Sequence, residues 1–288
     1  MNLSIKAPAK INWFLSVTGK REDGYHNIVS PMQCVNLFDD LQFDASEEIN
    51  LISDLAIPIE DNLVYKAAGL LKERTAYKGG VRIILKKNIP SAAGLGGGSS
   101  DAAFTLLGLN RLWGLKLDRE SLMKLGAEIG SDVPFFMGGP FSLVEGRGEK
   151  VTPLESKCPT NLLLVNPGIA VSSGWAYSNY DPKMLTKKAI DIKLFCQALD
   201  RKDLTSLKHM VFNDLEKAVM AEYREVAEIR EMLIVNGAAI VCMSGSGSTV
   251  YGVFRSAGEA AKASQYMGKY WCRVVSTLGV NEEREIWQ

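Results

Sequence analysis

The stretch Pro90-Ser91-Ala92-Ala93-Gly94-Leu95-Gly96-Gly97-Gly98-Ser99-Ser100-Asp101 is the sharpest local signal in the sequence. Its four closely spaced glycines let the backbone take positive φ and approach a ligand closely. Residues 102–113 then have the apolar spacing of an amphipathic helix. The unpaired N–H groups and dipole of a helix N-terminus attract anions, so the stretch predicts a phosphate-binding loop. The alternative interpretation is a flexible loop before a capped helix, without a ligand.

Three better-known phosphate motifs do not fit this stretch. A Walker A loop requires Gly-Lys-Ser/Thr at its end, whereas Gly98 is followed by Ser99-Ser100. A dinucleotide-binding fingerprint requires a third glycine where Ser99 stands. The catalytic motifs of protein kinases are also absent from the sequence. We therefore expect a nucleotide loop of another kind.

A second loop of small residues, 244–249, lies between two apolar segments that read as strands. By itself it is better explained as a hairpin turn, which needs no function. The presence of two such loops in one chain favours the interpretation that both surround one ligand.

Composition bounds the kind of partner. The 288 residues carry 33 basic and 33 acidic side chains, so the formal net charge is zero, and 47% of the residues are hydrophobic. Disorder is excluded by this much apolar surface, and a basic nucleic-acid binder by the lack of excess positive charge. No apolar run is long enough for a membrane span, and Lys6, Pro8 and Lys10 interrupt the N-terminal segment. The five scattered cysteines suit a reducing compartment, so we expect a cytoplasmic protein.

Strand and helix patterns mix without strict alternation, which predicts an α+β fold in both halves of the chain. The segment 145–159 mixes glycine, proline and charge and is the candidate domain junction, which divides the chain into domains 1–155 and 156–288. Asp61 is placed to cap the first helix. The expected strands are 5–17, 35–43, 81–85, 162–165, 239–244, 250–254 and 273–278. The expected helices are 62–74, 102–113, 122–129, 191–199, 204–220, 223–235 and 258–270.

Few polar side chains stand out as candidates for chemistry. Lys10 and Asn12 share one face of the first strand, where a solvated lysine would need no function. Asp132 follows a helix-stopping glycine, a common place for a turn aspartate. His26 falls in a turn, and His209 in a helical stretch where a structural role is expected. No metal-ligand cluster and no Ser-His-Asp ordering is apparent.

Taken together, three segments resemble the motifs of the GHMP kinase superfamily of small-molecule kinases: residues 7–12, 90–100 and 243–247. Residues 12–17, 21–26 and 130–136 look like those of the member that phosphorylates the 2-hydroxyl of a diphosphocytidyl methylerythritol in the non-mevalonate isoprenoid pathway. The resemblance covers essentially the whole chain. It implies a ribosomal-protein-S5-like N-terminal domain, a ferredoxin-like C-terminal domain and an active site in the cleft between them.

The resemblance also implies roles for individual residues. Lys10 and Asp132 match the catalytic pair. The substrate would contact Asn12, Tyr25, His26, Ser173, Tyr177, Gly245, Ser246 and Gly247, with Tyr25 and Tyr177 sandwiching the cytosine base and His26 reading its polar edge. ATP would contact Pro90, Ser91, Ala92, Ala93, Gly94, Leu95, Gly96, Gly97, Gly98, Ser99 and Ser100, together with Asn62 and Lys87 beside the adenosine. Mg²⁺ would accompany the phosphates, and no protein ligand for it is predicted.

Two departures from the pattern are visible. Ala92 and Ala93 stand where some members have further glycines, and Ser248 stands where the third motif often has proline, so we expect a looser turn there. The expected partner is a small molecule rather than a nucleic acid or a membrane, and the expected state is a monomer or weak homodimer. Two alternatives stay open: a sister kinase acting on mevalonate, homoserine or a sugar, and a catalytically silent nucleotide-binding protein.

Overall fold

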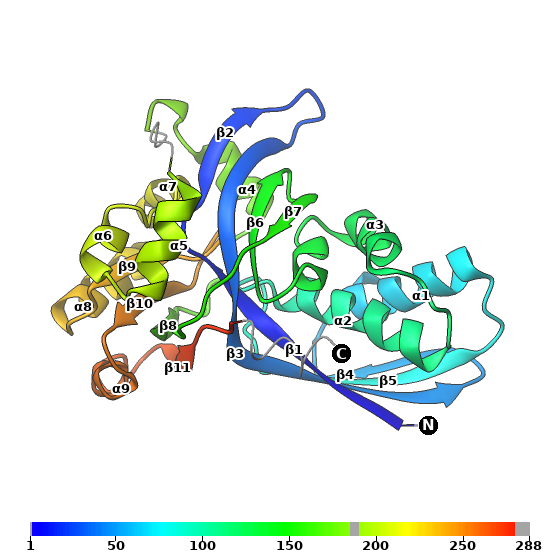
Figure 1. Cartoon of the computed structure of the whole chain (residues 1–288). Coiled ribbons are helices and arrows are strands. Elements are labelled where there is room, and N and C mark those ends of the chain that lie inside the picture. The colour runs from blue at the N-terminus through cyan, green and yellow to red at the C-terminus, as the bar shows by residue number, and fades with distance from the viewer. Residues whose placement is uncertain (1, 185–189, 280–288) are drawn as a thin grey trace.

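Two β-sheets organise the chain, and each is built from a different half of the sequence (Figure 1). The computed structural model describes residues 2–184 and 190–279. Within these residues a seven-stranded sheet uses strands that end by Pro153, and a four-stranded sheet uses strands that begin at Asn161. The α+β class is confirmed in both halves. The division at residue 155 falls between the two sheets and stays a prediction.

The N-terminal sheet is organised around one long strand, β3 (His26–Ser46). The sheet runs in the order β4-β5-β3-β6-β7, and β1 and β2 also pair with β3. All of its pairings are antiparallel except that of β4 with β5. The other strands are β1 (Asn2–Asn12), β2 (Ser16–Lys20), β4 (Ile49–Ser53), β5 (Gly80–Lys86), β6 (Phe141–Gly146) and β7 (Lys150–Pro153).

Three helices cover this sheet on the side away from the C-terminal half (Figure 1). They are α1 (Leu63–Thr75), α2 (Gly97–Leu112) and α3 (Arg119–Ile129), with short 3₁₀ turns η1 (Ile59–Asp61) and η2 (Pro134–Met137). Helix α2 lies directly on β1 and β3. A Cβ at Gly108 would come within 2.8 Å of Ile5 Cδ1, so the absence of a side chain allows this close packing.

The C-terminal sheet has the strand order β11-β8-β10-β9 and is antiparallel throughout. This order and the chain sequence of strands and helices match the ferredoxin-like βαββαβ arrangement expected for this half. The strands are β8 (Asn161–Asn166), β9 (Ile240–Met243), β10 (Val250–Phe254) and β11 (Trp271–Ser276). The helices are α4 (Ser173–Asn179), η3 (Pro182–Met184), α5 (Ile192–Asp200), α6 (Leu204–Lys208), α7 (Glu216–Glu222), α8 (Arg224–Val235) and α9 (Ala257–Ser264).

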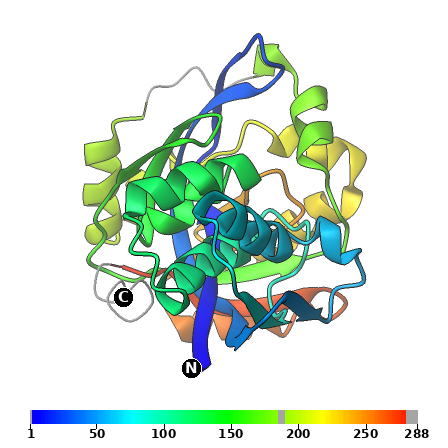
Figure 2. The ribbon, with the colours of Figure 1, turned by 90° about the vertical axis from the view of Figure 1, so that its right-hand side faces the viewer.

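The two halves meet over the end of β1. In Figure 2 helices of the N-terminal half face the viewer, and much of the C-terminal half lies behind them. Trp13 is fully buried there, with edge contacts to Phe195 and Tyr251 at centroid distances of 6.0 and 6.2 Å. The Tyr251 hydroxyl donates to the carbonyl oxygen of Asn12 at 3.0 Å. The C-terminal half therefore fixes the end of β1, which carries Lys10 and Asn12.

The expected continuous strand 5–17 is wrong. β1 ends at Asn12 and β2 begins at Ser16, because the backbone leaves the ladder at Trp13 and Phe14. This break turns the Trp13 indole into the core, where its Nε1 donates to Gln33 at 2.7 Å. The alternative explanation of Lys10 as a solvated surface lysine does not hold, since Lys10 and Asn12 are 2% and 1% exposed.

The expected cap of the first helix is shifted by one residue. Asn62, not Asp61, is the N-cap of α1, and its Oδ1 accepts the N–H of Val64 at 2.9 Å. The Asp61 residue instead ends the preceding 3₁₀ turn.

The expected helix 204–220 is two helices, α6 and α7. The chain breaks between them so that Leu15 N can donate to Phe212 O at 2.9 Å and Asn213 can reach the loop after β9. The helix expected at 258–270 is shorter, because α9 ends at Ser264.

The other expected strands and helices are present with shifted ends, and the strand at 250–254 is confirmed residue for residue. Three features were not expected: β4, β6 with its hairpin partner β7, and α4. β7 lies inside the segment predicted as a domain junction, so the connection between the sheets is shorter than the sequence indicates.

Candidate active site

The phosphate-binding loop predicted at 90–100 follows β5, leads into α2 and contacts the end of β1. Lys10 N donates to Leu95 O at 2.9 Å, which ties the loop to the strand. Helix α2 begins at Gly97, and its N-cap Gly96 has φ +69° and offers no side-chain cap. The N–H groups of this first turn therefore lack a side-chain capping partner, as an anion site requires.

The third motif, 243–247, lies directly against this loop. The Ser244 hydroxyl donates to Gly94 O at 2.9 Å, and Thr249 N donates to Ala93 O at 3.1 Å. Gly94 has φ +76°, and a Cβ there would lie 2.0 Å from Ser244 O. At Gly245, a Cβ would lie 3.1 Å from Lys10 Nζ. The three predicted motifs therefore converge on one place. Ser244 and Gly94, which are hydrogen bonded there, are 150 residues apart in the chain.

Lys10 and Asp132 form an ion pair at this place. Lys10 Nζ lies 3.6 Å from Asp132 Oδ2, and their side chains are 3% and 33% exposed. Burial lowers the pKa of Lys10, and the Asp132 carboxylate partly opposes that shift. The arrangement holds a cation in the core and leaves its carboxylate partner open to a ligand, as a base for an incoming hydroxyl would be.

A chain of hydrogen bonds orients Lys10 from the opposite side. Lys10 Nζ donates to Asn12 Oδ1 at 2.8 Å, and Asn12 Nδ2 donates to Ser30 Oγ at 2.8 Å. Asn12 is therefore joined to Lys10, and its expected contact with the acceptor stays a prediction. Ser30 was not singled out by the sequence, where a serine in a strand carries no distinguishing signal.

Aromatic rings lie beside Asp132. The His26 and Tyr177 rings stack with centroids 5.3 Å apart and planes 14° apart, and Tyr180 meets His26 edge-on at 5.2 Å. Burial, and then the nearby Asp132 charge, raise the pKa of the Tyr177 hydroxyl. Burial and the charge of Lys20 lower the pKa of His26, which keeps the imidazole neutral near pH 7.

Tyr25 lies further out than the expected sandwich implies. The residue is 51% exposed, and the Arg147 guanidinium lies 5.3 Å from its ring centroid. In the described structure His26, rather than Tyr25, is in ring contact with Tyr177. The expected pairing of Tyr25 with Tyr177 around a base stays a prediction.

Two residues expected to contact the substrate, Ser173 and Ser246, lie next to each other, and their contact with the substrate stays a prediction. Ser173, the first residue of α4, has its hydroxyl 3.0 Å from that of Ser246. The expectation of a loose turn at Ser248 is wrong, because this residue is fully buried and hydrogen bonded on both sides. Its hydroxyl donates to Ile169 O and accepts from Asn166 Nδ2.

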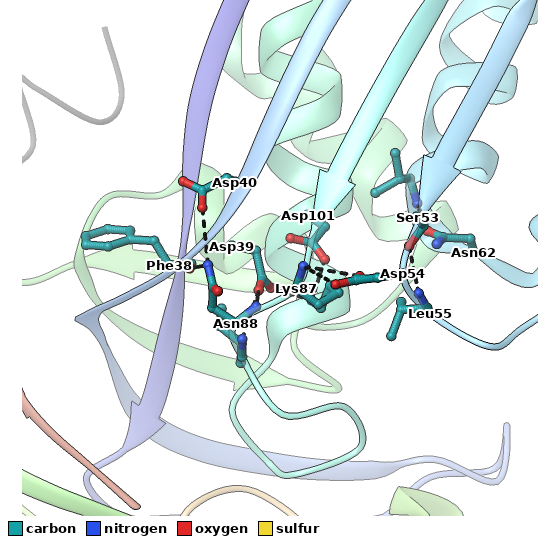
Figure 3. A network of polar contacts seen from close by, with 12 residues as sticks. Phe38, Asp39, Asp40, Ser53, Asp54, Leu55, Asn62, Lys87, Asn88 and Asp101 are labelled. Carbon is teal, nitrogen blue, oxygen red and sulfur yellow. Dashed lines mark hydrogen bonds and ion pairs between the residues drawn. The ribbon is translucent and has the colours of Figure 1, made fainter.

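The two residues expected beside adenosine are both engaged within the protein. Asn62 caps α1. The next residue, Leu63, would lie 3.6 Å from a Cβ at Gly98, so the start of α1 lies next to the glycine loop. Lys87 bonds to Asp39 and Asp101 (Figure 3). The contact of either residue with adenosine stays a prediction.

Asn213 is a site residue that the sequence did not suggest. Its Nδ2 donates to Met243 O and Gly245 O, both at 2.8 Å, and so shapes the third motif. The only signal was an asparagine inside an apparently continuous helix pattern, where a side chain that competes for backbone hydrogen bonds indicates a break.

No group of three histidine, cysteine or acidic side chains within residues 2–184 and 190–279 is arranged to hold a metal ion. Among the same residues, no helix is both long and apolar enough to cross a membrane. The cysteines Cys34, Cys158, Cys196, Cys242 and Cys272 are all free.

Comparison with known proteins finds similar proteins for both halves of the chain. The family model described as "GHMP kinases N terminal domain" matches residues 62–139, and that described as "GHMP kinases C terminal" matches residues 195–271. A protein of Thermodesulfovibrio yellowstonii named 4-diphosphocytidyl-2-C-methyl-D-erythritol kinase is 48% identical over 281 residues, which cover 96% of this chain and 98% of the relative.

Solved structures agree as well. A crystal structure titled 4-(cytidine 5'-diphospho)-2C-methyl-D-erythritol kinase superposes with a TM-score of 0.84 at 33% identity, covering 96% of this chain and all of that one. A mevalonate kinase from L. major has a TM-score of 0.75 at 15% identity, covers 96% of both chains and shares the fold alone.

The matched domains and the loop geometry define a GHMP kinase, an ATP-utilising kinase of small molecules. Within that superfamily, 48% identity over nearly the full length of both chains assigns the family. The chain belongs to the family of the 4-diphosphocytidyl-2-C-methyl-D-erythritol kinases.

Proposed function

We propose that this protein transfers the γ-phosphate of ATP to the 2-hydroxyl of 4-diphosphocytidyl-2-C-methyl-D-erythritol. The products are the 2-phosphate and ADP, and the step belongs to the non-mevalonate isoprenoid pathway. The observation that carries the proposal is the Lys10–Asp132 pair. The backbone of Lys10 is hydrogen bonded to the glycine loop, and the charge of Asp132 acts on Tyr177, whose ring stacks on that of His26. A phosphate donor and a base-bearing acceptor would thus meet at one carboxylate.

ATP would be held mainly by backbone. The loop 90–100 and the first turn of α2 offer N–H groups to the phosphates, and Asn62 would lie beside the adenosine. Ser100 Oγ is buried without a hydrogen-bond partner among the described residues, which supports a phosphate oxygen as its partner. Mg²⁺ would enter with the nucleotide, carried by phosphates and water, and would neutralise charge on the transferring group.

The reaction would proceed by direct transfer. The 2-hydroxyl oxygen forms a bond to Pγ while the bond from Pγ to the β–γ bridging oxygen breaks and ADP leaves. Asp132 accepts the hydroxyl proton, and its exposed edge suits it to meet the alcohol. Lys10 holds the carboxylate in place and offsets the negative charge that develops on the transferring group.

The acceptor would be recognised by its base and by its alcohol. Tyr25 and Tyr177 would enclose cytosine, and a neutral His26 would both donate to and accept from its polar edge. Asn12, Ser173 and the loop Gly245-Ser246-Gly247 would contact the methylerythritol and its phosphates. We also propose a cytoplasmic location and a monomeric or weakly dimeric state.

A panel of acceptors tests this function. ADP release is measured with ATP and Mg²⁺ in the presence of the cytidyl methylerythritol, mevalonate, homoserine or galactose. The proposal requires turnover with the cytidyl acceptor and little with the other three. Preference for another alcohol would assign a sister kinase activity, and no turnover with any of them would indicate a nucleotide-binding protein without catalysis.

A further inference from the structure

One short segment between α6 and α7, residues 212–216, holds two parts of the protein that the proposed acceptor would contact. Its first partner is the start of β2. Leu15 N donates into the segment at 2.9 Å, and Asp214 N donates back to Leu15 O at 3.0 Å. The Asp214 carboxylate also accepts the N–H of Val17 at 2.8 Å. Because β2 leads directly into the turn 21–26, the segment fixes the strand that enters this turn.

The second partner of the segment is the end of β9, which is an edge strand of its sheet. Glu216 Oε1 accepts the N–H of Met243 at 3.1 Å, and Asn213 Nδ2 donates to the Met243 carbonyl oxygen at 2.8 Å. Asn213 Nδ2 also donates to Gly245 O at 2.8 Å, and its Oδ1 accepts the N–H of Leu215 at 2.9 Å. Asn213 is 7% exposed, so this side chain serves the backbone around it.

The bond from Asn213 to Gly245 matters because of what lies beside that glycine. A Cβ at Gly245 would lie 3.1 Å from Lys10 Nζ and 3.4 Å from Asn12 Oδ1, so its backbone passes directly beside the buried ammonium group. A Gly245 carbonyl released from Asn213 could accept a hydrogen bond from Lys10, in competition with Asp132. By holding this carbonyl, Asn213 leaves the ammonium group to Asn12 and Asp132.

We propose that Asn213 is a positioning residue for the acceptor. It fixes the backbone of the third motif, and its segment aligns this motif with the turn 21–26, so that both meet the acceptor in one geometry. The inference rests on the proposed contacts of these two parts with the acceptor. The third motif touches the glycine loop only near Ala93 and Gly94, ahead of the first turn of α2, so we expect ATP to depend less on Asn213.

The variant Asn213→Ser tests this role with a small change. A serine hydroxyl can still accept the N–H two residues further on, which preserves the local turn. It has only one proton to donate, so it cannot hold two carbonyl oxygens. The matched control is Asn236→Ser, because Asn236 Nδ2 likewise donates to a backbone carbonyl, Met232 O at 2.7 Å, at the end of α8.

Two measurements separate a positioning role from a merely structural one. In calorimetric titrations of each ligand alone, Asn213→Ser should weaken acceptor binding by about tenfold, as the loss of roughly one hydrogen bond would, and ATP binding by less than about threefold. In the ligand-free protein, amide hydrogen exchange of residues 244–249 should become faster, because the loop loses its support. The control should leave both affinities and this exchange unchanged.

Equal losses of affinity for the two ligands, or an unchanged affinity for the acceptor, would overturn the proposal. If Asn213→Ser does not fold, Asn213→Asp replaces it, since aspartate keeps the shape and the acceptor atom and removes both donors. The same difference between the ligands is then required. Failure of both variants to fold contradicts the proposal, because Asn213 would then serve folding.

The titrated acceptor is the alcohol that the panel selects, so a different substrate leaves this test intact. If no alcohol is turned over, hydrogen exchange decides. Unchanged exchange of residues 244–249 in Asn213→Ser would overturn the positioning role. Faster exchange would support it, and the missing turnover would then count against the proposed function alone.

Discussion

The strongest test of the mechanism is Asp132→Asn, which removes the proposed base and keeps its size. The pair with Lys10 spans 3.6 Å. At an effective dielectric constant of about 20 this corresponds to an attraction of roughly 5 kcal/mol. The carboxylate is one-third exposed, so solvent screening leaves only a part of that for folding. A loss of about 1 kcal/mol would lower the melting temperature by only about 2–4 °C in a chain of this size.

The effect on turnover should be much larger than the effect on folding. General base catalysis contributes about 10²- to 10⁴-fold, or roughly 3–5 kcal/mol of barrier. We therefore expect kcat to fall at least about 100-fold. The amide can still fill the space of the carboxylate, so the dissociation constants of ATP and the cytidyl acceptor should change little.

The assay follows ADP release with a coupled enzyme system, and calorimetry and thermal melting check binding and folding in the same preparations. Asp118→Asn is the matched control, because Asp118 is an exposed helix cap and asparagine caps equally well. A kcat within about tenfold of the wild type, with normal folding, would refute general base catalysis by Asp132.

Three further changes test other parts of the site. Tyr25→Ala should raise the KM for the cytidyl acceptor by about 5- to 150-fold, through lost stacking of roughly 1–3 kcal/mol. The control Tyr266→Ala, at an exposed tyrosine, should leave this KM unchanged. Equal effects of the two variants on steady-state kinetics would contradict the stacking of cytosine on Tyr25. Gly94→Ala should lower kcat/KM by about tenfold or more, because the new Cβ would meet Ser244 O. The control Gly114→Ala, at φ +65° with open space around it, should cost about 1 kcal/mol of stability and no activity. Similar activities of the two variants would refute the close packing of the two loops. Burial raises the pKa of Asp101 to about 7, above its value in the unfolded chain, so its stabilising contribution is present at low pH and lost as pH rises through about 7. Asp101→Asn should therefore flatten the change in melting temperature between about pH 5.5 and about pH 8. An unaltered slope would show that another group titrates.

Local chemistry explains why the sequence could predict the motifs. Gly94 and Gly96 adopt positive φ, as a run of closely spaced glycines suggests, and the helix that follows presents its N-terminus to the loop. These features depend on backbone freedom and neighbouring residues, which a single sequence displays. The α+β class follows for the same reason, from apolar periodicities that read correctly over short segments.

Long-range pairing explains what the sequence could not predict. The break at Trp13 exists because a distant aromatic cluster accepts the indole, and the break at Asn213 exists because its side chain reaches the loop after β9. The burial of Lys10 likewise depends on a domain that begins about 150 residues later. No periodicity within the segment itself carries this information, because tertiary contacts override local preference.

The ion pairs change the meaning of the chain's zero net charge. Both ligands proposed for this site are strongly anionic, yet the two lysines nearest the loop are each bonded to carboxylates: Lys10 to Asp132, and Lys87 to Asp39 and Asp101. Their formal charges are therefore largely cancelled before a ligand arrives. The attraction for phosphate must come chiefly from the N–H groups and dipole of α2, which carry no formal charge and act only at short range. Such a site selects a phosphate by its fit to a fixed backbone rather than by attraction to an additional free cation.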